Sequence, residues 1–248
     1  MVADGRAPAV KEQVFRQIGT AKPGGIVAVC DHASNRVPEG VVLGIAPELL
    51  QKHIAWDIGA AGVTEELARA HGIPAHLAEV SRLVIDLHRE EDSTGLIPEA
   101  SDGHVIPGNL DADRGARIAQ FHQPYHAALA EWLAAAKPAL ILSIHSFTPT
   151  LESAPHPRPW ELGILYNQDD RAARLAIAGL AARGFTVGDN EPYSGRLLNA
   201  TMNRHAEACG RPYLAIEIRN DLIGDATGQA RWAAILAELA REATAELG

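Results

Sequence analysis

The sequence has 248 residues, of which 47% are hydrophobic and 21% are charged, and this composition supports a substantial core and excludes a largely disordered chain. The formal net charge of -9 argues against a general nucleic-acid-binding protein, which would normally present a basic face. No uninterrupted apolar stretch reaches the roughly 20 residues that span a bilayer, so no membrane segment is expected.

Location is predicted from the N-terminus and the cysteines. The first 13 residues carry charges and no apolar run, so no secretory signal is expected. The two cysteines, Cys30 and Cys209, are far apart and form no CxxC motif. This pattern favours the reducing cytoplasm over a disulfide-stabilised protein.

Along the chain, short apolar runs alternate with longer helical patterns. Strands are predicted at residues 26–30, 83–87, 139–144, 162–166 and 213–218. Helices are predicted at residues 60–71, 114–136 and 169–183, and from about residue 226 to the end. The polar segment 90–112, rich in Gly and Pro, is predicted to be a lid or binding loop. With no convincing linker, we expect one domain over 1–248, of the α/β class, with its sheet covered on both faces.

Titratable side chains occur at the ends of several predicted strands. His32 follows strand 26–30, and His145 follows strand 139–144. In open α/β sheets, ligands bind beyond the carboxyl ends of the strands, so these two histidines are expected to converge there. Catalytic zinc takes three protein ligands and keeps one position open, and neutral imidazole suits it. The pattern therefore predicts a zinc site with His32 and His145 as ligands.

The third ligand is left open between two residues. Asp57 is the better donor chemically, although it could equally be the N-cap of the helix at 60–71. Asn35 lies three residues after His32, where a carboxylate would be more usual, and it could equally belong to a turn before Pro38. Asp57 is the preferred ligand, and Asn35 is then assigned to substrate binding.

Glu217 is the predicted general base. It lies inside an apolar strand, where a charge needs a partner, and it could accept a proton from a water activated by the metal. An ion pair with a nearby arginine is the alternative. Strand alternation places Glu217 on the mixed side, while Leu214, Ile216 and Ile218 form an all-apolar side that should pack on helices.

Three arginines suggest an acidic substrate. Arg82 and Arg89 flank residues 83–87, and Arg219 closely follows Glu217. The guanidinium fork suits a carboxylate, so these side chains are candidates for substrate binding. Structural pairing with nearby aspartates is the alternative for each of them.

Other catalytic motifs are absent or incomplete. The sequence has no GxSxG, Walker A or GxGxxG motif. His122 and His126 have i,i+4 spacing but lack the HExxH glutamate, and Pro124 between them disturbs the helix geometry. His126 is therefore predicted to contact substrate or to lie behind the site, with a surface helix face as the alternative.

Together these motifs resemble the N-formylglutamate amidohydrolase family. The matching segments, in order, are Asp31-His32-Ala33-Ser34-Asn35-Arg36-Val37-Pro38, Asp57-Ile58-Gly59, Ser81-Arg82-Leu83-Val84-Ile85-Asp86-Leu87-His88-Arg89, Pro124-Tyr125-His126, His145-Ser146-Phe147-Thr148-Pro149, Pro192-Tyr193-Ser194-Gly195 and Glu217-Ile218-Arg219-Asn220-Asp221-Leu222. The resemblance implies a three-layer α/β/α sandwich of the phosphorylase/hydrolase-like type, similar to zinc carboxypeptidases, with a mixed, mostly parallel sheet.

The resemblance also implies an activity. It implies hydrolysis of the amide bond of an N-formyl or related N-acyl amino acid such as N-formylglutamate, with His32 and His145 as metal ligands, Glu217 as base, and Arg82 and Arg89 as substrate contacts. The chain departs from the family pattern in having His-Ala-Ser-Asn where His-Ser-Gly is usual, and His-Arg at 88–89 where Asn-Arg is usual. The alternatives are a deacylase with a different N-acyl or amide substrate and a catalytically silent metal-binding or small-acid-binding protein on the same scaffold.

Overall fold

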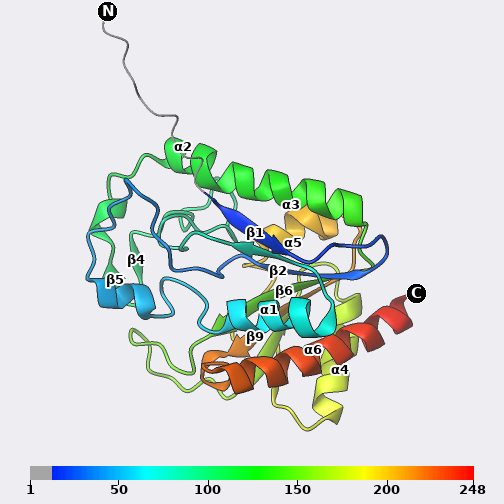
Figure 1. Cartoon of the computed structure of the whole chain (residues 1–248). Helices are drawn as coiled ribbons and strands as arrows, with labels where there is room; N and C mark the ends of the chain where they lie inside the picture. Colours follow the sequence, from blue (N-terminus) through cyan, green and yellow to red (C-terminus); the bar gives the residue numbers. More distant parts are fainter. Residues whose placement is uncertain (1–12) are drawn as a thin grey trace, which may run out of the picture.

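The computed structural model describes residues 13–248 and is organised around a mixed seven-stranded sheet (Figure 1). The order across the sheet is β1-β3-β2-β6-β9-β7-β8. The strands are β1 (Phe15–Ile18), β2 (Ile26–Cys30), β3 (Ala75–Ala78), β6 (Leu140–Phe147), β7 (Leu162–Leu165), β8 (Val187–Asp189) and β9 (Tyr213–Arg219). The central strands β3, β2, β6 and β9 are parallel, whereas β1 and β7 pair with them antiparallel. The predicted α/β class with a mixed sheet is confirmed.

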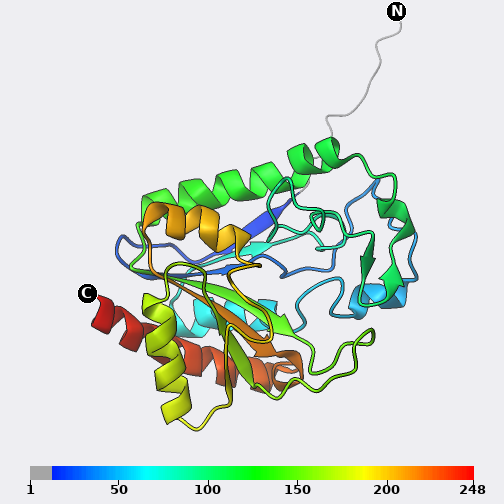
Figure 2. The same ribbon diagram turned by 180° about the vertical axis from the view of Figure 1, so that it is seen from behind.

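Helices cover both faces of this sheet (Figure 1, Figure 2). On one face lie α1 (Ala60–His71), α4 (Arg171–Ala182) and α6 (Ala226–Leu247). On the other lie α2 (Arg114–Arg117), η3 (Ile118–His122), α3 (Gln123–Ala136) and α5 (Ala200–His205). The remaining short elements are η1 (Pro47–Gln51), η2 (Pro107–Asn109), η4 (Glu207–Cys209), η5 (Asn220–Leu222) and a separate two-stranded ribbon of β4 (Ala100–Ser101) and β5 (His104–Val105).

The face under α1, α4 and α6 is almost wholly apolar. Leu214, Ile216 and Ile218 of β9 point into this core, as their alternation predicts. Trp232 and Leu236 of α6 are buried against the same cluster. The long tail helix is therefore held by hydrophobic burial along its length.

The predicted helix 114–136 is continuous but contains a π-helical turn. At η3 the N–H of Gln123 bonds to the carbonyl of Ile118, five residues back. Pro124 explains this turn, because proline has no N–H to donate and its ring clashes with the carbonyl four residues before it. A wider π turn avoids both problems.

The predicted strand at 83–87 is wrong. The segment follows tight turns, with the N–H of Val84 bonded to the carbonyl of Ser81 and the N–H of Arg89 bonded to the carbonyl of Asp86. Its apolar side chains are buried because the turns lie under the helix layer, so burial does not imply a strand here. The parallel strand between β2 and the edge is instead β3, which the sequence pattern missed, as it did β1 and β8.

Two expectations about location concerned a membrane segment and a secretory signal. No helix in residues 13–248 is both long and apolar enough to cross a membrane. The prediction that the chain starts without a secretory signal rests on the N-terminal segment, and residues 1–12 of it lie outside the described residues.

Candidate metal centre and active site

Three neighbouring parallel strands, β2, β6 and β9, bring the predicted site residues together. His32 lies just beyond the end of β2, while His145 and Glu217 lie inside β6 and β9. The register places His145 directly opposite Glu217. All three side chains are almost completely buried. The predicted convergence of the two histidines is observed, with ring centroids 5.1 Å apart.

Asp57 joins the two histidines. Its Oδ2 atom lies 2.9 Å from Nδ1 of His145 and 3.3 Å from Nδ1 of His32. The N-cap interpretation is wrong, because helix α1 begins after Gly59, with no side-chain cap. Gly59 has a φ of 83°, and a Cβ there would come within 2.3 Å of the carbonyl oxygen of Ile223, so only glycine fits. This turn directs Asp57 away from the helix and towards the histidines.

The outer nitrogens of both histidines face other polar groups. Nε2 of His32 lies 2.7 Å from Oδ1 of Asp86. Nε2 of His145 lies 3.1 Å from the Ser143 hydroxyl and 3.6 Å from Oδ2 of Asp31. A neutral ring that donates from Nε2 keeps its lone pair on Nδ1, which here points towards Asp57. A carboxylate that receives the outer N–H is the usual support of a zinc-binding histidine.

This donor set fits a metal ion. His32, Asp57 and His145 each offer a ligand atom, and these atoms lie within 4.8 Å of one another. Two nitrogen lone pairs and a carboxylate oxygen directed at one buried point repel each other unless a cation or protons lie between them. Nitrogen and oxygen donors in this number match catalytic zinc, which leaves a position for water.

Charges shift the ionisation of the same groups. Burial opposes ionisation of Asp57, but when protons on His32 and His145 supply the positive charge, the two rings outweigh burial and hold the pKa of Asp57 below its ordinary value. Burial raises the pKa of Glu217 to about 7, against the opposing effects of His145 and Arg82. Oε2 of Glu217 has no hydrogen-bond partner within residues 13–248. A carboxylate that is buried, unpaired and titrates near neutrality has the properties of a general base.

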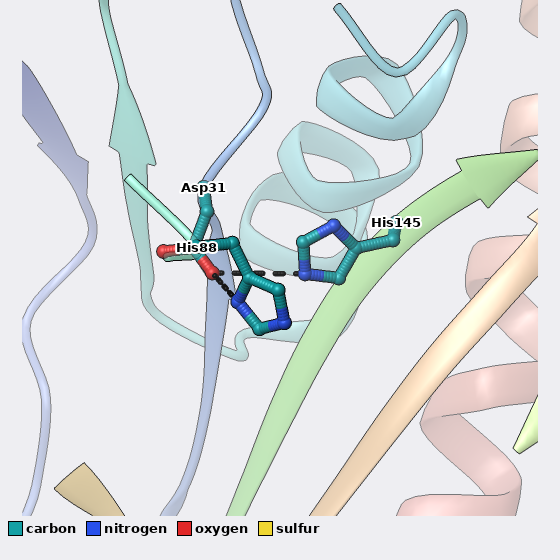
Figure 3. A group of neighbouring side chains, drawn as sticks. All are labelled: Asp31, His88 and His145. Carbon is teal, nitrogen blue, oxygen red and sulfur yellow. Dashed lines mark hydrogen bonds and ion pairs between the residues drawn. The ribbon is translucent and has the colours of Figure 1, made fainter. Parts of the chain in front are cut away.

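Asp31 and His88 form a second layer beside His145 (Figure 3). Nδ1 of His88 lies 3.0 Å from Oδ2 of Asp31, and the hydroxyl of Tyr125 donates to Oδ1 of Asp31 over 2.7 Å. Asp31, His88 and His145 also offer ligand atoms within 4.8 Å of one another. Asp31, however, already accepts a hydrogen bond from Tyr125 and faces two imidazole nitrogens, so its geometry is that of an outer partner to His145.

A cavity of about 240 Å³ opens above these residues. The histidines, Asp57 and Glu217 form its floor, and both Arg82 and Arg89 line it. Arg82 bridges two carboxylates, at 3.2 Å from Asp57 and 2.8 Å from Asp86, which is the structural pairing considered above. Arg89 makes only a looser 3.7 Å contact with Asp86, so its guanidinium has more donors left for a ligand.

Three predicted substrate contacts lie outside the cavity lining. The side-chain amide of Asn35 donates to the carbonyl of Leu50 over 2.8 Å, in a turn. Arg219 pairs with Asp221 over 2.8 Å. His126 is buried behind the site. The geometry thus separates these side chains from Arg82 and Arg89, and it favours Asp57 over Asn35 as the third ligand.

Some residues in and behind the cavity were not selected from the sequence. Asp31, His88 and Tyr193 lie within segments that carry the family resemblance, and a zinc-binding histidine usually has an outer carboxylate partner, which would have pointed to Asp31. His53 and Asp102 line the cavity from distant loops. No local pattern links those two loops to the strand ends, so only the tertiary structure reveals them.

Comparisons with known proteins agree with this geometry. The family model of N-formylglutamate amidohydrolase matches residues 24–224. A solved gene product of Agrobacterium tumefaciens is 33% identical, with a TM-score of 0.88 over 96% of this chain and 97% of the other. An N-formylglutamate amidohydrolase from Ralstonia eutropha JMP134 is 23% identical, with a TM-score of 0.73 over 94% of this chain and 98% of the other, which shows a common fold. None of the curated proteins matches significantly.

Proposed function

Because the chain belongs to the N-formylglutamate amidohydrolase family, we propose that it is a zinc-dependent hydrolase of N-formylglutamate or a related N-acyl amino acid. Family membership supports the coarser statement that the reaction is hydrolysis of the amide bond of an acyl amino acid. The metal dependence and the acidic substrate are the proposed refinements. The cytoplasm is the proposed location, on the basis of cysteine usage.

The observation that carries the proposal is the placement of Glu217. Its carboxylate is buried, has an unpartnered oxygen, and lies opposite His145 on the adjacent strand. Glu217 forms no ion pair with Arg82, Arg89 or Arg219 in the described part of the chain. A structural carboxylate would be paired at this depth, so the unpaired group supports a role in proton transfer.

The residues then divide the chemistry between them. His32, Asp57 and His145 would hold zinc, which when bound polarises the acyl carbonyl and lowers the pKa of a bound water. Glu217 removes a proton from the attacking water and delivers it to the nitrogen that leaves with the amino acid. Arg89 binds the carboxylate of that amino acid, and Arg82 keeps Asp57 and Asp86 ionised and in place.

The test compares zinc-loaded and metal-free protein on a panel of N-formyl and N-acetyl amino acids, alongside Glu217→Gln. Glutamine keeps the shape and removes the base, so we expect normal folding and zinc content with turnover lower by about 10²-fold or more. Glu131→Gln, on the exposed side of α3, is the matched control and should behave as wild type. Loss of zinc from Glu217→Gln would make Glu217 a ligand, and near-normal turnover would require another base.

A protein that binds zinc and N-formylglutamate but hydrolyses nothing in the panel would be the silent binding protein. Turnover confined to other acyl groups would identify a deacylase of different specificity. The first result would overturn the proposed hydrolysis, and the second would exclude N-formylglutamate as the substrate; both leave the family assignment intact.

A further inference from the structure

One face of the helix formed by η3 and α3 reaches the back of the active site. Nε2 of His122 lies 2.9 Å from the carbonyl oxygen of Arg89, and Nε2 of His126 lies 2.9 Å from that of Leu87. Between these two residues of the helix, the hydroxyl of Tyr125 donates to Asp31. Three side chains of one helix therefore bind three groups behind the cavity, namely two backbone carbonyls and the carboxylate of Asp31.

The direction of these hydrogen bonds is fixed by chemistry. A carbonyl oxygen only accepts, so His122 and His126 must both donate from Nε2. Nδ1 of neutral His126 is then an acceptor, and it faces Nε2 of His205 at 2.9 Å with the two rings stacked. Burial lowers the pKa of His126 to about 2, which agrees with a neutral ring. His205 thus fixes the tautomer that His126 needs.

The held segment is fixed by turn and side-chain hydrogen bonds and not by a helix or a strand ladder. The stretch from Arg82 to Glu90 forms neither helix nor strand, yet it carries His88 and Arg89 into the cavity. The two bonded carbonyls belong to Leu87 and Arg89, on either side of His88. The hydroxyl of Thr201 gives a longer 3.4 Å contact to the Leu87 carbonyl. Backbone that lacks a ladder of its own takes its position from such side-chain bonds.

We infer that His122, Tyr125 and His126 form a positioning face, which sets the place of Arg89 through the backbone and the place of His145 through Asp31. The residues touch neither the cavity nor the predicted ligand atoms directly. His126 is accordingly a positioning residue and not a substrate contact. The inference rests on the proposed function where it takes Arg89 as the group that binds the substrate carboxylate.

The first arm of the test separates His122→Met from His122→Gln. Glutamine can present an N–H near the position of Nε2, whereas methionine fills the space without a donor. We expect KM for N-formylglutamate to rise about tenfold in His122→Met and to return most of the way in His122→Gln, with kcat changed by less than about threefold in both. Zinc affinity should stay at the wild-type value, because Arg89 is not a ligand.

The second arm uses Tyr125→Phe and zinc alone. Loss of the hydroxyl frees Asp31, so the zinc dissociation constant, measured against a competing chelator, should rise about tenfold. KM of the fully zinc-loaded variant should stay within about threefold of wild type. His122→Met is expected to raise KM alone, and Tyr125→Phe is expected to raise the zinc dissociation constant alone. A general loss of helix stability would not separate these two quantities.

Leu133→Val, deeper in α3 and buried in the same core, is the matched control. It should lower the midpoint of thermal unfolding without changing KM or zinc affinity. The inference is overturned if His122→Met and Tyr125→Phe lower only thermal stability, as the control does. If wild type shows no turnover, the proposed function fails; the dissociation constant of N-formylglutamate then replaces KM, and the zinc arm still decides the role of Tyr125.

Discussion

The two faces of the sheet are buried by different chemistry. Under α1, α4 and α6, the buried side chains are aliphatic residues, many of them alanine, together with Trp232. Under α3 and α5, the buried set includes His76, His122, His126 and His205, each of which is hydrogen-bonded. Apolar burial is non-directional and tolerates repacking, whereas a buried polar group needs a partner in one direction. The first face therefore holds the sheet together, and the second holds the site in place.

The largest expected effect tests the apolar face. Leu236→Ala in α6 removes a fully buried side chain, and we expect the free energy of unfolding to fall by about 2–5 kcal/mol. Urea denaturation measures this change. At a temperature where the variant is folded, kcat/KM should equal the wild-type value. A lower kcat/KM in the folded variant would show that the two faces are not separable.

Next in size is the loss of a metal ligand. Asp57→Asn removes the charge between His32 and His145, and we expect the zinc dissociation constant to rise by about 10²-fold or more. Asp86→Asn changes a residue outside the ligand set, which contacts the outer nitrogen of His32 and pairs with Arg82, and it should have a smaller effect of about 10- to 100-fold. Equal zinc affinity in wild type and Asp57→Asn would remove Asp57 from the ligand set.

A smaller change is expected for substrate binding. Arg89→Ala should raise KM for an N-acyl amino acid about 10- to 100-fold, the equivalent of a hydrogen bond to a charged group of about 1.5–3 kcal/mol. An N-formyl amine without a carboxylate is the control substrate, and its hydrolysis should not respond. Arg82→Ala should instead lower stability, because it removes the guanidinium that pairs with both buried carboxylates, Asp57 and Asp86. An equal response of both substrates would argue against carboxylate recognition by Arg89.

The smallest effect concerns pH and His76. Burial lowers the pKa of His76 to about 4, so between about pH 4 and 6.5 the unfolded chain binds a proton that the folded protein does not. Stability from this residue is present above that window and is lost as the pH falls through it. His76→Gln cannot titrate, so its unfolding free energy should fall less steeply with acid, by up to about 1.4 kcal/mol per pH unit. Parallel pH profiles for the two proteins would contradict a neutral, buried His76.

Much of the fold and of the candidate metal site could be predicted from the sequence. Helix 60–71 and the central strands have long or continuous apolar patterns, and the strands place His32, His145 and Glu217 at one edge. The segment 83–87 misled the analysis because a buried turn and a buried strand have the same composition. Polar residues interrupt the apolar pattern of β1 and β3, as His76 does in β3, and β8 is too short for a clear pattern.

Residue roles were harder to predict than residue types. Asp57 precedes a helix closely enough to resemble an N-cap, and only the left-handed turn at Gly59 shows that it points elsewhere. His126 and Arg219 were predicted to contact the substrate. In the structure His126 contacts His205 of α5, and Arg219 pairs with Asp221 of the 220–222 turn. Direction of a side chain depends on tertiary packing, which spacing along the chain does not encode.

The π turn before α3 also limits how the chain can change in length. Each residue of an α-helix turns the side chains by about 100°, so the extra residue in η3 sets the rotational phase between its two flanks. Upstream, Arg117 donates to the carbonyl of Val84 over 2.7 Å, while downstream His126 bonds to Leu87. Deleting one residue from 118–122 would change this phase by about 100° and swing Arg117 off its acceptor. The length of the segment from Arg117 to His126 is therefore fixed by the two carbonyl groups that its ends bind.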